Sequence, residues 1–288
     1  MTRGAVSARE AVRSATRKLA AAGIPEPEAS AQFLLAELLG VGRVDLMVRD
    51  LVLTDEQRAV YKTWISRRRA REPVQRILGY AYFRNLKLNL NHETLIPRPD
   101  TESVVEAALE CIDRLDGGCR VLDIGTGSGA IAVSIAQERP GCEVHASDTS
   151  EAALRLACRN AADASVEVRF HRTDLVSNLD DLNGNINLLV SNPPYIRTDD
   201  IPALAPEVRD WDPPDALDGG PDGLKFYRRI FAETPPLLRS GAYLVLEVGD
   251  GQAADVLGLG RRAGFVPLGE HSDLTGTPRA VVLRWRTE

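Results

Sequence analysis

In the first part of the chain, hydrophobic residues recur every three or four positions, which is the spacing of amphipathic helices. The segment "PEASAQFLLAELLG" places Phe33, Leu34 and Leu38 on one helical face and ends in glycine, a common helix stop. A second segment, "TDEQRAVYKTWISRRRA", begins at Thr54, a typical capping residue. The pattern predicts several short helices packed as a small bundle over residues 1–75.

The period changes to two in the next segment. In "ILGYAYFRNLKLNLN", apolar and polar residues alternate as they do in a β-hairpin. The proline-punctuated "LIPRPDTE" that follows, Leu95–Glu102, is typical of a link. Thr101 stands where it can cap the predicted helix "ESVVEAALECIDRL". We assign a hairpin and linker to residues 76–100.

From Arg120 onward, strand-like and helix-like runs alternate, which predicts parallel strands joined by right-handed crossovers. The last two strand-like runs, "FVPLGEHSDL" and "RAVVLRW", are separated only by "TGTP", which is too short for a crossover helix. They must form a hairpin. The sequence thus predicts an α/β fold over residues 101–288, with a mostly parallel seven-stranded sheet closed by a C-terminal antiparallel hairpin.

Composition is that of an ordinary globular protein. Of the 288 residues, 44% are hydrophobic and 26% are charged. No apolar run approaches the ~18 residues of a membrane-spanning helix, and the N-terminus lacks an apolar signal core. We therefore expect a cytoplasmic protein with no membrane partner. The four cysteines form no CxxC pair and no histidine cluster lies near them, so we expect reduced thiols and no metal site.

Charge is distributed unevenly along the chain. Residues 1–90 contain 16 Lys and Arg against 9 Asp and Glu, whereas the remainder contains 19 against 32. The basic "SRRRAREP" is either a solvated helix end, where cations suit the helix dipole, or a docking surface for an acidic partner or nucleic acid. The docking candidates are Arg67, Arg68, Arg69 and Arg71. The acidic remainder argues against a catalytic domain that lies along a phosphate backbone.

A glycine-rich turn between a predicted strand and helix is the first candidate binding site. In "VLDIGTGSGAIA", Gly125, Gly127 and Gly129 allow a sharp turn and a close approach of the backbone to a ligand. Asp123 lies at the strand end, facing the crevice. The pattern alone fits a tight structural turn, a nicotinamide-dinucleotide site or an S-adenosylmethionine site.

Acidic residues end the next two strands. Asp148 follows Gly129 by 19 residues and can bond the ribose hydroxyls of an adenosine cofactor, cap the following helix, or do both. Asp174 ends the third strand and can reach an adenine edge or act as a plain helix cap. Together with "LIPRPDTE" before the first strand and "SNPPY" after the fourth, these positions favour S-adenosylmethionine.

The segment "VSNPPYIR" ends a buried strand with two prolines that cannot donate backbone hydrogen bonds. A planar –NH2 group is a poor nucleophile because its lone pair is delocalised, so its methylation needs two acceptors that hold its hydrogens. The side chain of Asn192 and the carbonyl of Pro193 can supply them, and Tyr195 can stack on the planar group. The alternative is a rigid loop in which the prolines only stop the strand.

Four segments, "LIPRPDTE", "VLDIGTGSGAIA", "SNPPYI" and "ALDGGPDGLKFYRRI", together resemble the release-factor glutamine methyltransferases, the HemK-like family. The resemblance covers nearly the whole chain, including "EPVQRILG". It implies methyl transfer from S-adenosylmethionine, with S-adenosylhomocysteine as product, to the amide nitrogen of the glutamine in the GGQ motif of class 1 peptide-chain release factors. The N-terminal bundle would grip the release factor. We expect a monomer, with nucleic acid disfavoured as substrate.

Matched position by position, the resemblance implies roles for individual residues. The catalytic roles fall to Asn192, Pro193 and Tyr195. The implied cofactor-binding residues are Asp123, Gly125, Thr126, Gly127, Ser128, Gly129, Asp148, Asp174, Leu175 and Asn192. The implied substrate-binding residues are Asn192, Pro193, Pro194, Tyr195, Arg98 and Glu102.

The chain departs from the family pattern at Arg76, Asn85, Leu175 and Asp212–Pro213, which affects docking and the adenine pocket rather than the chemistry.

Two other functions stay open. An N6-adenine-type nucleic-acid amino-methyltransferase uses the same Asn-Pro-Pro-aromatic arrangement on a flipped base, but the acidic catalytic part argues against it. A non-catalytic S-adenosylmethionine-binding adaptor would be expected to lack Asn192 or the glycine turn, and both are present.

Overall fold

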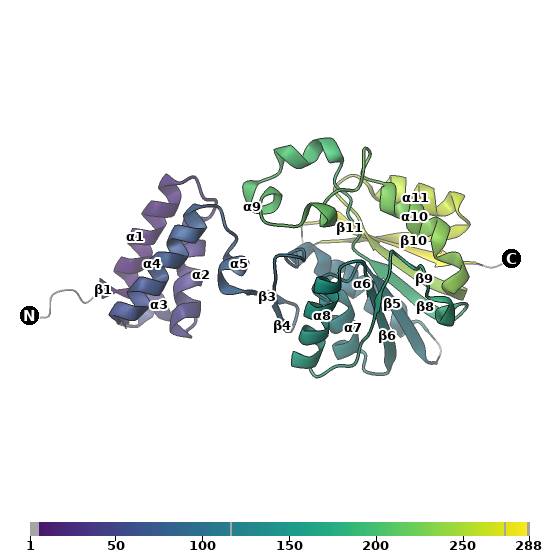
Figure 1. The fold of residues 1–288 in the computed structure, drawn as a ribbon, viewed down its shortest axis with the longest axis horizontal. Helices are drawn as coiled ribbons and strands as arrows, with labels where there is room; N and C mark the ends of the chain where they lie inside the picture. The colour runs from purple at the N-terminus through teal and green to yellow at the C-terminus, as the bar shows by residue number, and fades with distance from the viewer. Residues whose placement is uncertain (1–5, 116, 274, 287–288) are drawn as a thin grey trace, which may run out of the picture. The chain divides into compact units, whose positions relative to one another are not determined.

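The computed structural model describes residues 6–115, 117–273 and 275–286. This part of the chain divides into two compact units, one ending at Gly79 and the other beginning at Tyr80 (Figure 1). Each unit has its own hydrophobic core. None of the described helices is long and apolar enough to cross a membrane.

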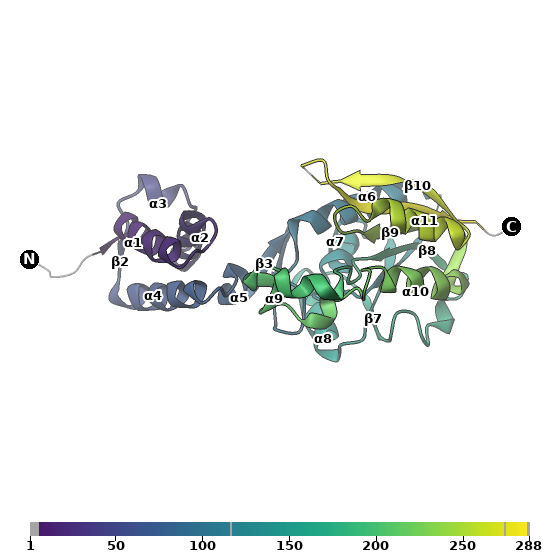
Figure 2. The same ribbon diagram turned by 90° about the horizontal axis from the view of Figure 1, so that it is seen from above.

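Helices dominate the N-terminal unit. Its elements are β1 (Val6–Ser7), α1 (Ala8–Ala21), α2 (Pro27–Leu39), α3 (Asp45–Val48), β2 (Val52–Leu53), α4 (Asp55–Arg69) and α5 (Val74–Leu78). Helices α1, α2 and α4 pack on one another (Figure 2), and Leu19, Leu34 and Ile65 are buried in their shared core. Thr54 begins α4 through a reciprocal capping box with Gln57, so the predicted cap is confirmed.

The basic segment at the end of α4 is mostly used inside this unit. Arg67 pairs with Glu72 at 2.5 Å. Arg68 is buried, and Arg71 donates to a backbone carbonyl at 2.7 Å. Within the described part of the chain, only Arg69 of the four docking candidates has no hydrogen bond or ion pair. The other three support the local fold, which leaves Arg69 as the docking candidate.

The second unit is an α/β fold. Its strands are β3 (Tyr80–Phe83), β4 (Leu86–Asn89), β5 (Cys119–Ile124), β6 (Cys142–Asp148), β7 (Arg169–Arg172), β8 (Ile186–Ser191), β9 (Leu238–Glu247), β10 (Phe265–Ser272) and β11 (Pro278–Trp285). Its α-helices are α6 (Glu102–Asp113), α7 (Ala130–Glu138), α8 (Glu151–Asp163), α9 (Pro206–Arg209), α10 (Lys225–Glu233) and α11 (Ala253–Arg262). Short 3₁₀ turns are η1 (Pro99–Thr101), η2 (Asp180–Leu182), η3 (Thr198–Ala203), η4 (Pro214–Ala216) and η5 (Pro235–Leu237).

Among the described residues, the main sheet has seven strands in the order β10-β11-β9-β8-β5-β6-β7. Strands β9, β8, β5, β6 and β7 pair in parallel, whereas β11 is antiparallel to both β9 and β10. The predicted parallel sheet with its C-terminal antiparallel hairpin is therefore confirmed. Strands β3 and β4 form a separate antiparallel hairpin.

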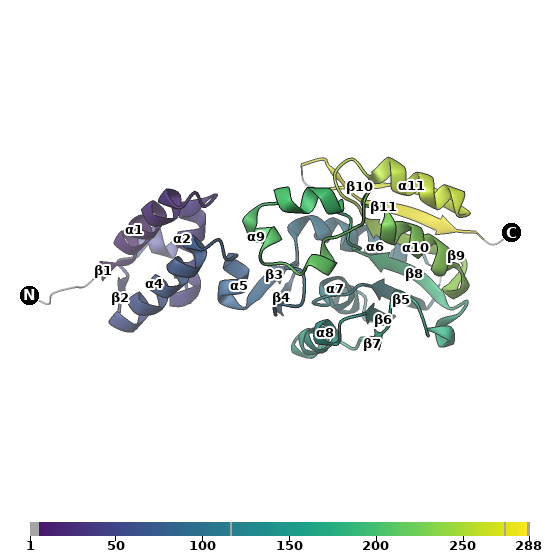
Figure 3. The same cartoon turned by 45° about the horizontal axis from the view of Figure 1, so that its top comes forward.

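Helices cover both faces of the main sheet (Figure 3). Helices α6, α7 and α8 share one core with Val121 of β5, while α10 and α11 share the other core with Leu122. Neighbouring residues of β5 are both apolar because the strand is buried on both faces. The chain leaves β5 for β6 and β7 on one side and returns to β8 on the other. Such a switch in strand order opens a crevice at the carboxyl ends of the strands.

Candidate active site

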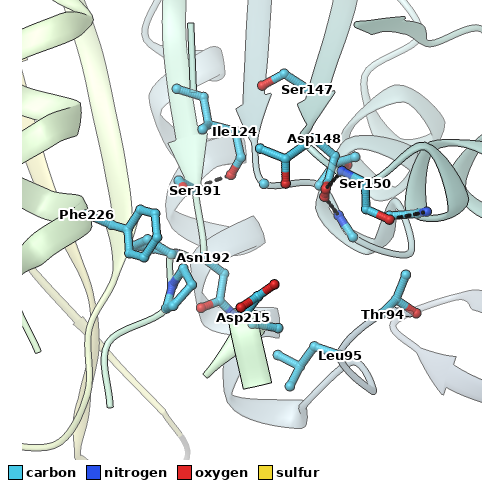
Figure 4. Close-up of a pocket in the computed structure, with 18 of the residues that line it drawn as sticks. Thr94, Leu95, Ile124, Ser147, Asp148, Ser150, Ser191, Asn192, Asp215 and Phe226 are labelled. Carbon is cyan, nitrogen blue, oxygen red and sulfur yellow. Dashed lines mark hydrogen bonds between the residues drawn. The ribbon is translucent and has the colours of Figure 1, made fainter. Parts of the chain in front are cut away.

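A cavity of about 540 Å³ opens at the carboxyl ends of β5, β6 and β8 (Figure 4). The predicted site residues that line it are Arg98, Gly125, Thr126, Gly127, Ser128, Asp148, Asp174, Leu175, Asn192, Pro193 and Pro194. Four predicted residues lie outside its walls, namely Glu102, Asp123, Gly129 and Tyr195. The sequence motifs therefore converge on one place, although not every side chain points into it.

The glycine turn holds the backbone in a conformation that other residues avoid. Gly125, Gly127 and Gly129 have φ angles of 72°, 56° and 84°. A Cβ atom on Gly129 would lie 3.1 Å from the Cβ of Ala157 in α8, so the absent side chain permits close packing. The N–H of Gly125 donates to the carbonyl of Ser147 at 2.8 Å, which joins the turn to β6.

Asp148 connects three parts of the cavity wall. Its Oδ2 atom accepts a hydrogen bond from the N–H of Gly127 at 2.9 Å, and Oδ1 accepts from the N–H of Ser150 at 2.8 Å. Ser150 itself caps α8 by accepting from the N–H of Ala153 at 3.2 Å. The capping alternative for Asp148 is therefore wrong. Its carboxylate keeps acceptor capacity toward the cavity that it lines.

Asp123 lies beneath the glycine turn. It is fully buried, and its Oδ2 atom accepts a hydrogen bond of 2.6 Å from the hydroxyl of Thr126. Oδ1 has no hydrogen-bond partner among the described residues. Burial, with a smaller contribution from the nearby Asp148, raises the pKa of Asp123 to about 7 against the opposing effect of the Thr126 hydrogen bond. The crevice-facing position predicted for Asp123 is not the one it occupies.

Asp174 and Leu175 form the far wall of the cavity. Asp174 pairs with Arg229 of α10 through two contacts, of 3.0 and 3.1 Å. The next helical turn, η2, begins only at Asp180, so Asp174 does not cap a helix. Leu175 is buried with a positive φ of 52°, and its carbonyl accepts from the hydroxyl of Ser147 at 3.2 Å.

The end of β8 brings Asn192 to the cavity. Ser191 donates to the carbonyl of Ile124 at 2.7 Å, which holds β8 against β5 at this level (Figure 4). The Nδ2 atom of Asn192 donates to the hydroxyl oxygen of Thr101 at 3.2 Å. The Oδ1 atom has no partner among the described residues, so it is the atom of this amide that can accept a ligand hydrogen.

The loop that contains Gly219 and Gly223 packs closely against the backbone of Tyr195, directly after the Pro-Pro turn. A Cβ atom on Gly219 would lie 2.7 Å from the Cα of Tyr195, and one on Gly223 would lie 2.4 Å from its carbonyl oxygen. Gly219 and Gly223 of "ALDGGPDGLKFYRRI" therefore need to lack a side chain for this close backbone contact. The Tyr195 hydroxyl donates to Glu247 at 3.2 Å, and its ring packs beside the core under α10 and α11. Tyr195 supports the turn and does not face the cavity.

Some residues of the "RPDTE" segment line the cavity, and others stabilise the surrounding fold. Arg98 lines the cavity and forms an ion pair with buried Asp212. Asp212 is one of the family departures, so that substitution holds a site residue in place. Glu102 accepts from the backbone N–H of Arg84 at 2.9 Å and faces the β3–β4 hairpin instead. Thr101 makes no side-chain capping bond to α6, so the cap predicted there is wrong.

Several wall residues were not predicted. The cavity is also lined by Thr94, Leu95, Asp215, Lys225, Phe226 and Arg229. Phe226 and Arg229 are three residues apart on α10, so the helical period of "LKFYRRI" could have placed them on one face. Asp215 lies on η4, and no periodicity in "DPPDAL" signals its position.

A second cavity, of about 290 Å³, lies in the N-terminal unit between α1 and α4. Tyr61 and Ile65 contribute to its floor, and Lys18, Lys62 and Arg69 contribute cations to its wall. These three cations are exposed and have no ion-pair partner among the described residues. Arg58, which pairs with Asp55, and the carboxylate of Glu10 also line the cavity. Its wall therefore combines apolar residues with four cations and one carboxylate, a net positive charge.

Known proteins match both units. Residues 10–79 match the model of the PrmC N-terminal domain, and residues 104–205 match that of the Methyltransferase small domain. A release factor glutamine methyltransferase from Rhodospirillum rubrum is 42% identical over 273 residues, spanning 93% of this chain and 82% of its own. One from Geobacter sulfurreducens is 42% identical over 264 residues, spanning 91% of each chain. The chain belongs to the release factor glutamine methyltransferase family.

Solved structures share the fold of this methyltransferase. The hMettl16 catalytic domain in complex with MAT2A 3'UTR hairpin 1 has a TM-score of 0.54 and 16% identity, covering 88% of this chain and 90% of its own. A methyltransferase from Pyrococcus furiosus has a TM-score of 0.52 and 18% identity, covering 71% and 91%. At these identities the likeness is one of fold.

The methyltransferase uses S-adenosylmethionine, and the cavity residues fit this cofactor. No heavy atom lies within 4 Å of a Cβ built on Gly125 or Gly127, so space for a ligand adjoins the turn. Asp148 offers carboxylate lone pairs suited to ribose hydroxyls. Phe226 offers an apolar surface suited to a flat base.

Proposed function

We propose that the methyltransferase transfers a methyl group from S-adenosylmethionine to the side-chain amide nitrogen of the glutamine in the GGQ motif of class 1 peptide-chain release factors. The observation that carries the proposal is the Asn192–Thr101 hydrogen bond, which leaves Asn192 Oδ1 as an acceptor at the cavity wall. Relatives 35–42% identical to this chain are named release factor glutamine methyltransferase, which favours a glutamine amide over an adenine amine.

Positioning is the main task of the protein groups. When bound, S-adenosylmethionine would supply an activated methyl group and leave as S-adenosylhomocysteine, and the methylated nitrogen would release one of its two hydrogens to solvent as a proton. The substrate amide is a weak nucleophile because its nitrogen lone pair is delocalised. Asn192 Oδ1 and the Pro193 carbonyl accept its two hydrogens and fix the direction of the lone pair. Tyr195 and the glycine loop behind it keep that carbonyl in place, which replaces the stacking role first assigned to Tyr195.

The remaining wall residues divide between the two ligands. Asp148 holds the ribose of the cofactor, with its orientation fixed by Gly127. Asp174 and Leu175 border the adenine. Arg98, held by Asp212, faces the substrate loop. Asp123 acts from beneath the turn rather than on the ligand.

The N-terminal unit docks the release factor. A single glutamine offers few contacts, so binding at a distance must help to position it. The second cavity, with Lys18, Lys62 and Arg69 around its wall, suits an acidic segment of a folded protein. The same function places the enzyme in the cytoplasm, and we propose that it acts as a monomer.

The decisive experiment is methylation with methyl-labelled S-adenosylmethionine and a purified class 1 release factor, followed by peptide mapping. Label is expected on the GGQ glutamine and absent from a release factor with alanine at that position. DNA and RNA are parallel substrates. Label on nucleic acid with none on the release factor would contradict the proposal and promote the adenine alternative.

A further inference from the structure

Asn160 is a buried polar residue of α8 that joins the glycine turn to the β3–β4 hairpin. It is 1% exposed and is not part of the cavity wall. Its Nδ2 atom donates to the carbonyl of Ser128 at 2.8 Å and to the carbonyl of Asn89 at 3.2 Å. Its Oδ1 atom accepts from the backbone N–H of Asn89 at 2.8 Å and from Asn89 Nδ2 at 3.0 Å. The side-chain amide is therefore fully engaged by the turn and the hairpin.

Two backbone groups decide how the Asn160 amide is oriented. The N–H of Asn89 can only donate a hydrogen bond, and the carbonyl of Ser128 can only accept one. An inverted amide would set its oxygen against the Ser128 carbonyl and its –NH2 against the Asn89 N–H, which would leave buried polar groups without partners. The hairpin thus holds the amide in the orientation that presents a donor to the turn.

The glycine turn needs partners outside itself, because glycine has little conformational preference of its own. Ser128 lines the cavity between Gly127 and Gly129, whose φ angles of 56° and 84° are both positive. Ala157 of α8 lies close beside Gly129. Asn160 follows three residues later on the same helical face and holds the Ser128 carbonyl. The carbonyl is therefore directed toward α8.

We propose that Asn160 is a positioning residue for cofactor binding, which fixes the Ser128 carbonyl and with it the glycine turn that receives S-adenosylmethionine. The inference rests on the proposed placement of the cofactor against this turn, and not on the identity of the methyl acceptor. Without Asn160, the buried carbonyl would lose its partner and the turn would sample other conformations. The cofactor would then have to order the turn as it binds, which lowers its affinity.

The test compares Asn160→Ala with Asn89→Ala, which truncates an asparagine on the other side of the same contact. Asn89→Ala removes side-chain bonds to Asn160 and Asp163, but it keeps the backbone N–H and carbonyl that orient Asn160. Both variants should therefore melt at a lower temperature than the wild type. In calorimetry with S-adenosylhomocysteine, only Asn160→Ala is expected to lose affinity, by about tenfold, the effect of one lost hydrogen bond to a buried group. Its KM for S-adenosylmethionine should rise by a similar factor while kcat stays within about twofold, because the groups that hold the methyl acceptor are untouched.

Asn160→Asp is a second variant that keeps the shape of the side chain, and it decides the test if truncation prevents folding. Its carboxylate can accept both bonds from Asn89 but cannot donate to Ser128, so affinity should fall as it does in Asn160→Ala.

Hydrogen exchange of the enzyme without cofactor gives a readout that is independent of activity. The N–H of Gly129 donates to the carbonyl of Thr126 at 2.8 Å within the turn, so its exchange rate reports whether the turn is held. Nuclear magnetic resonance should show faster exchange at Gly129 in both Asn160 variants and an unchanged rate in Asn89→Ala.

Equal S-adenosylhomocysteine affinity of the wild type and the Asn160 variants would overturn the inference. Equal losses of affinity in Asn160→Ala and Asn89→Ala, or unchanged exchange at Gly129, would do the same. The proposed function fails on a different result, the labelling of nucleic acid in place of the release factor. That result would contradict the methyl acceptor and leave the measurements on cofactor binding valid.

Discussion

Gly127 donates its backbone N–H to Asp148 Oδ2 at 2.9 Å, so the turn after β5 is tied directly to the end of β6. The bond leaves the Asp148 carboxylate with a fixed orientation at the cavity wall. Because Ser150 holds the other oxygen at 2.8 Å, the side chain is oriented before any ligand arrives. Such pre-organisation lowers the entropic cost of binding.

Asp148→Ala is expected to weaken S-adenosylhomocysteine binding by about 1.5–3 kcal/mol, the usual loss for a charged hydrogen-bond partner. Titration calorimetry measures this directly. Asp255→Ala, on the exposed face of α11, is the matched control and should bind as the wild type does. Equal affinity of the wild type and Asp148→Ala would show that Asp148 only stabilises the glycine turn and does not bind the cofactor.

Asn192→Ala should keep cofactor affinity and lose most turnover, because its side-chain oxygen acts on the acceptor amide. Asn192→Asp should recover little, although it has nearly the same shape. A carboxylate cannot donate to Thr101 as the Asn192 amide does, and it adds negative charge near Asp215. Single-turnover methylation and calorimetry separate the two effects. Full turnover by Asn192→Ala would remove Asn192 from the catalytic role.

The strand and helix pattern could be predicted from the sequence because both units follow their hydrophobic periods closely. The direction of individual side chains could not. Asp148 is the last residue of β6 and Asp123 the last but one of β5, yet Asp123 is fully buried beneath the turn and Asp148 lines the cavity. Successive side chains of a strand point to opposite faces of the sheet. The residue at which a strand ends depends on the turn that follows, so the sequence does not show which face a residue near the strand end occupies. The sequence motifs therefore located the site, but they did not show which side chains line the cavity and which lie beneath it.

Tertiary partners also overrode local signals. Thr101 has the residue type of a helix cap, but Asn192, which is 91 residues away, takes its hydroxyl. Arg67 and Arg71 belong to a basic run that is typical of a solvated or docking surface. In the fold, Arg67 instead pairs with the carboxylate of Glu72, and Arg71 donates to the backbone carbonyl of Gly23. A local sequence pattern cannot predict these partners, because residues that are distant in the sequence come together only when the chain is folded.

Asp123→Asn should become more stable relative to the wild type as pH rises. Burial raises the pKa of Asp123 from an ordinary 3.8 to about 7, so the neutral form is favoured in the fold. The stability this gives is complete below the unfolded pKa and is lost as pH rises through the folded pKa. Between pH 5 and 8 the difference should change by about 2–3 kcal/mol. Urea unfolding of the apo proteins measures it, and a pH-independent difference would contradict the assignment.

Gly223→Ala should damage the active site through the backbone of Tyr195. The added Cβ would lie 2.4 Å from the Tyr195 carbonyl oxygen and 2.6 Å from Gln252 Nε2. Such overpacking costs about 1–3 kcal/mol and should displace the Pro-Pro turn. Gly251→Ala is the matched control, because φ is positive at both glycines, 74° and 75°, but nothing lies within 4 Å of a Cβ at Gly251. Turnover should fall in Gly223→Ala only, and equal turnover would show that this close backbone contact is dispensable.

Reversal of the three cations around the second cavity, as the triple variant Lys18→Glu, Lys62→Glu and Arg69→Glu, should impair docking. KM for intact release factor is expected to rise about tenfold or more, since charge complementarity steers association. Affinity for S-adenosylhomocysteine and methylation of a short GGQ peptide should stay unchanged, because neither uses this cavity. The control triple reverses Arg13, Arg17 and Arg43, which are exposed in the same unit but outside the cavity wall. If the two triple variants have equal effects on KM, net charge rather than this cavity accounts for the effect. If neither variant changes KM, the release factor docks at another surface.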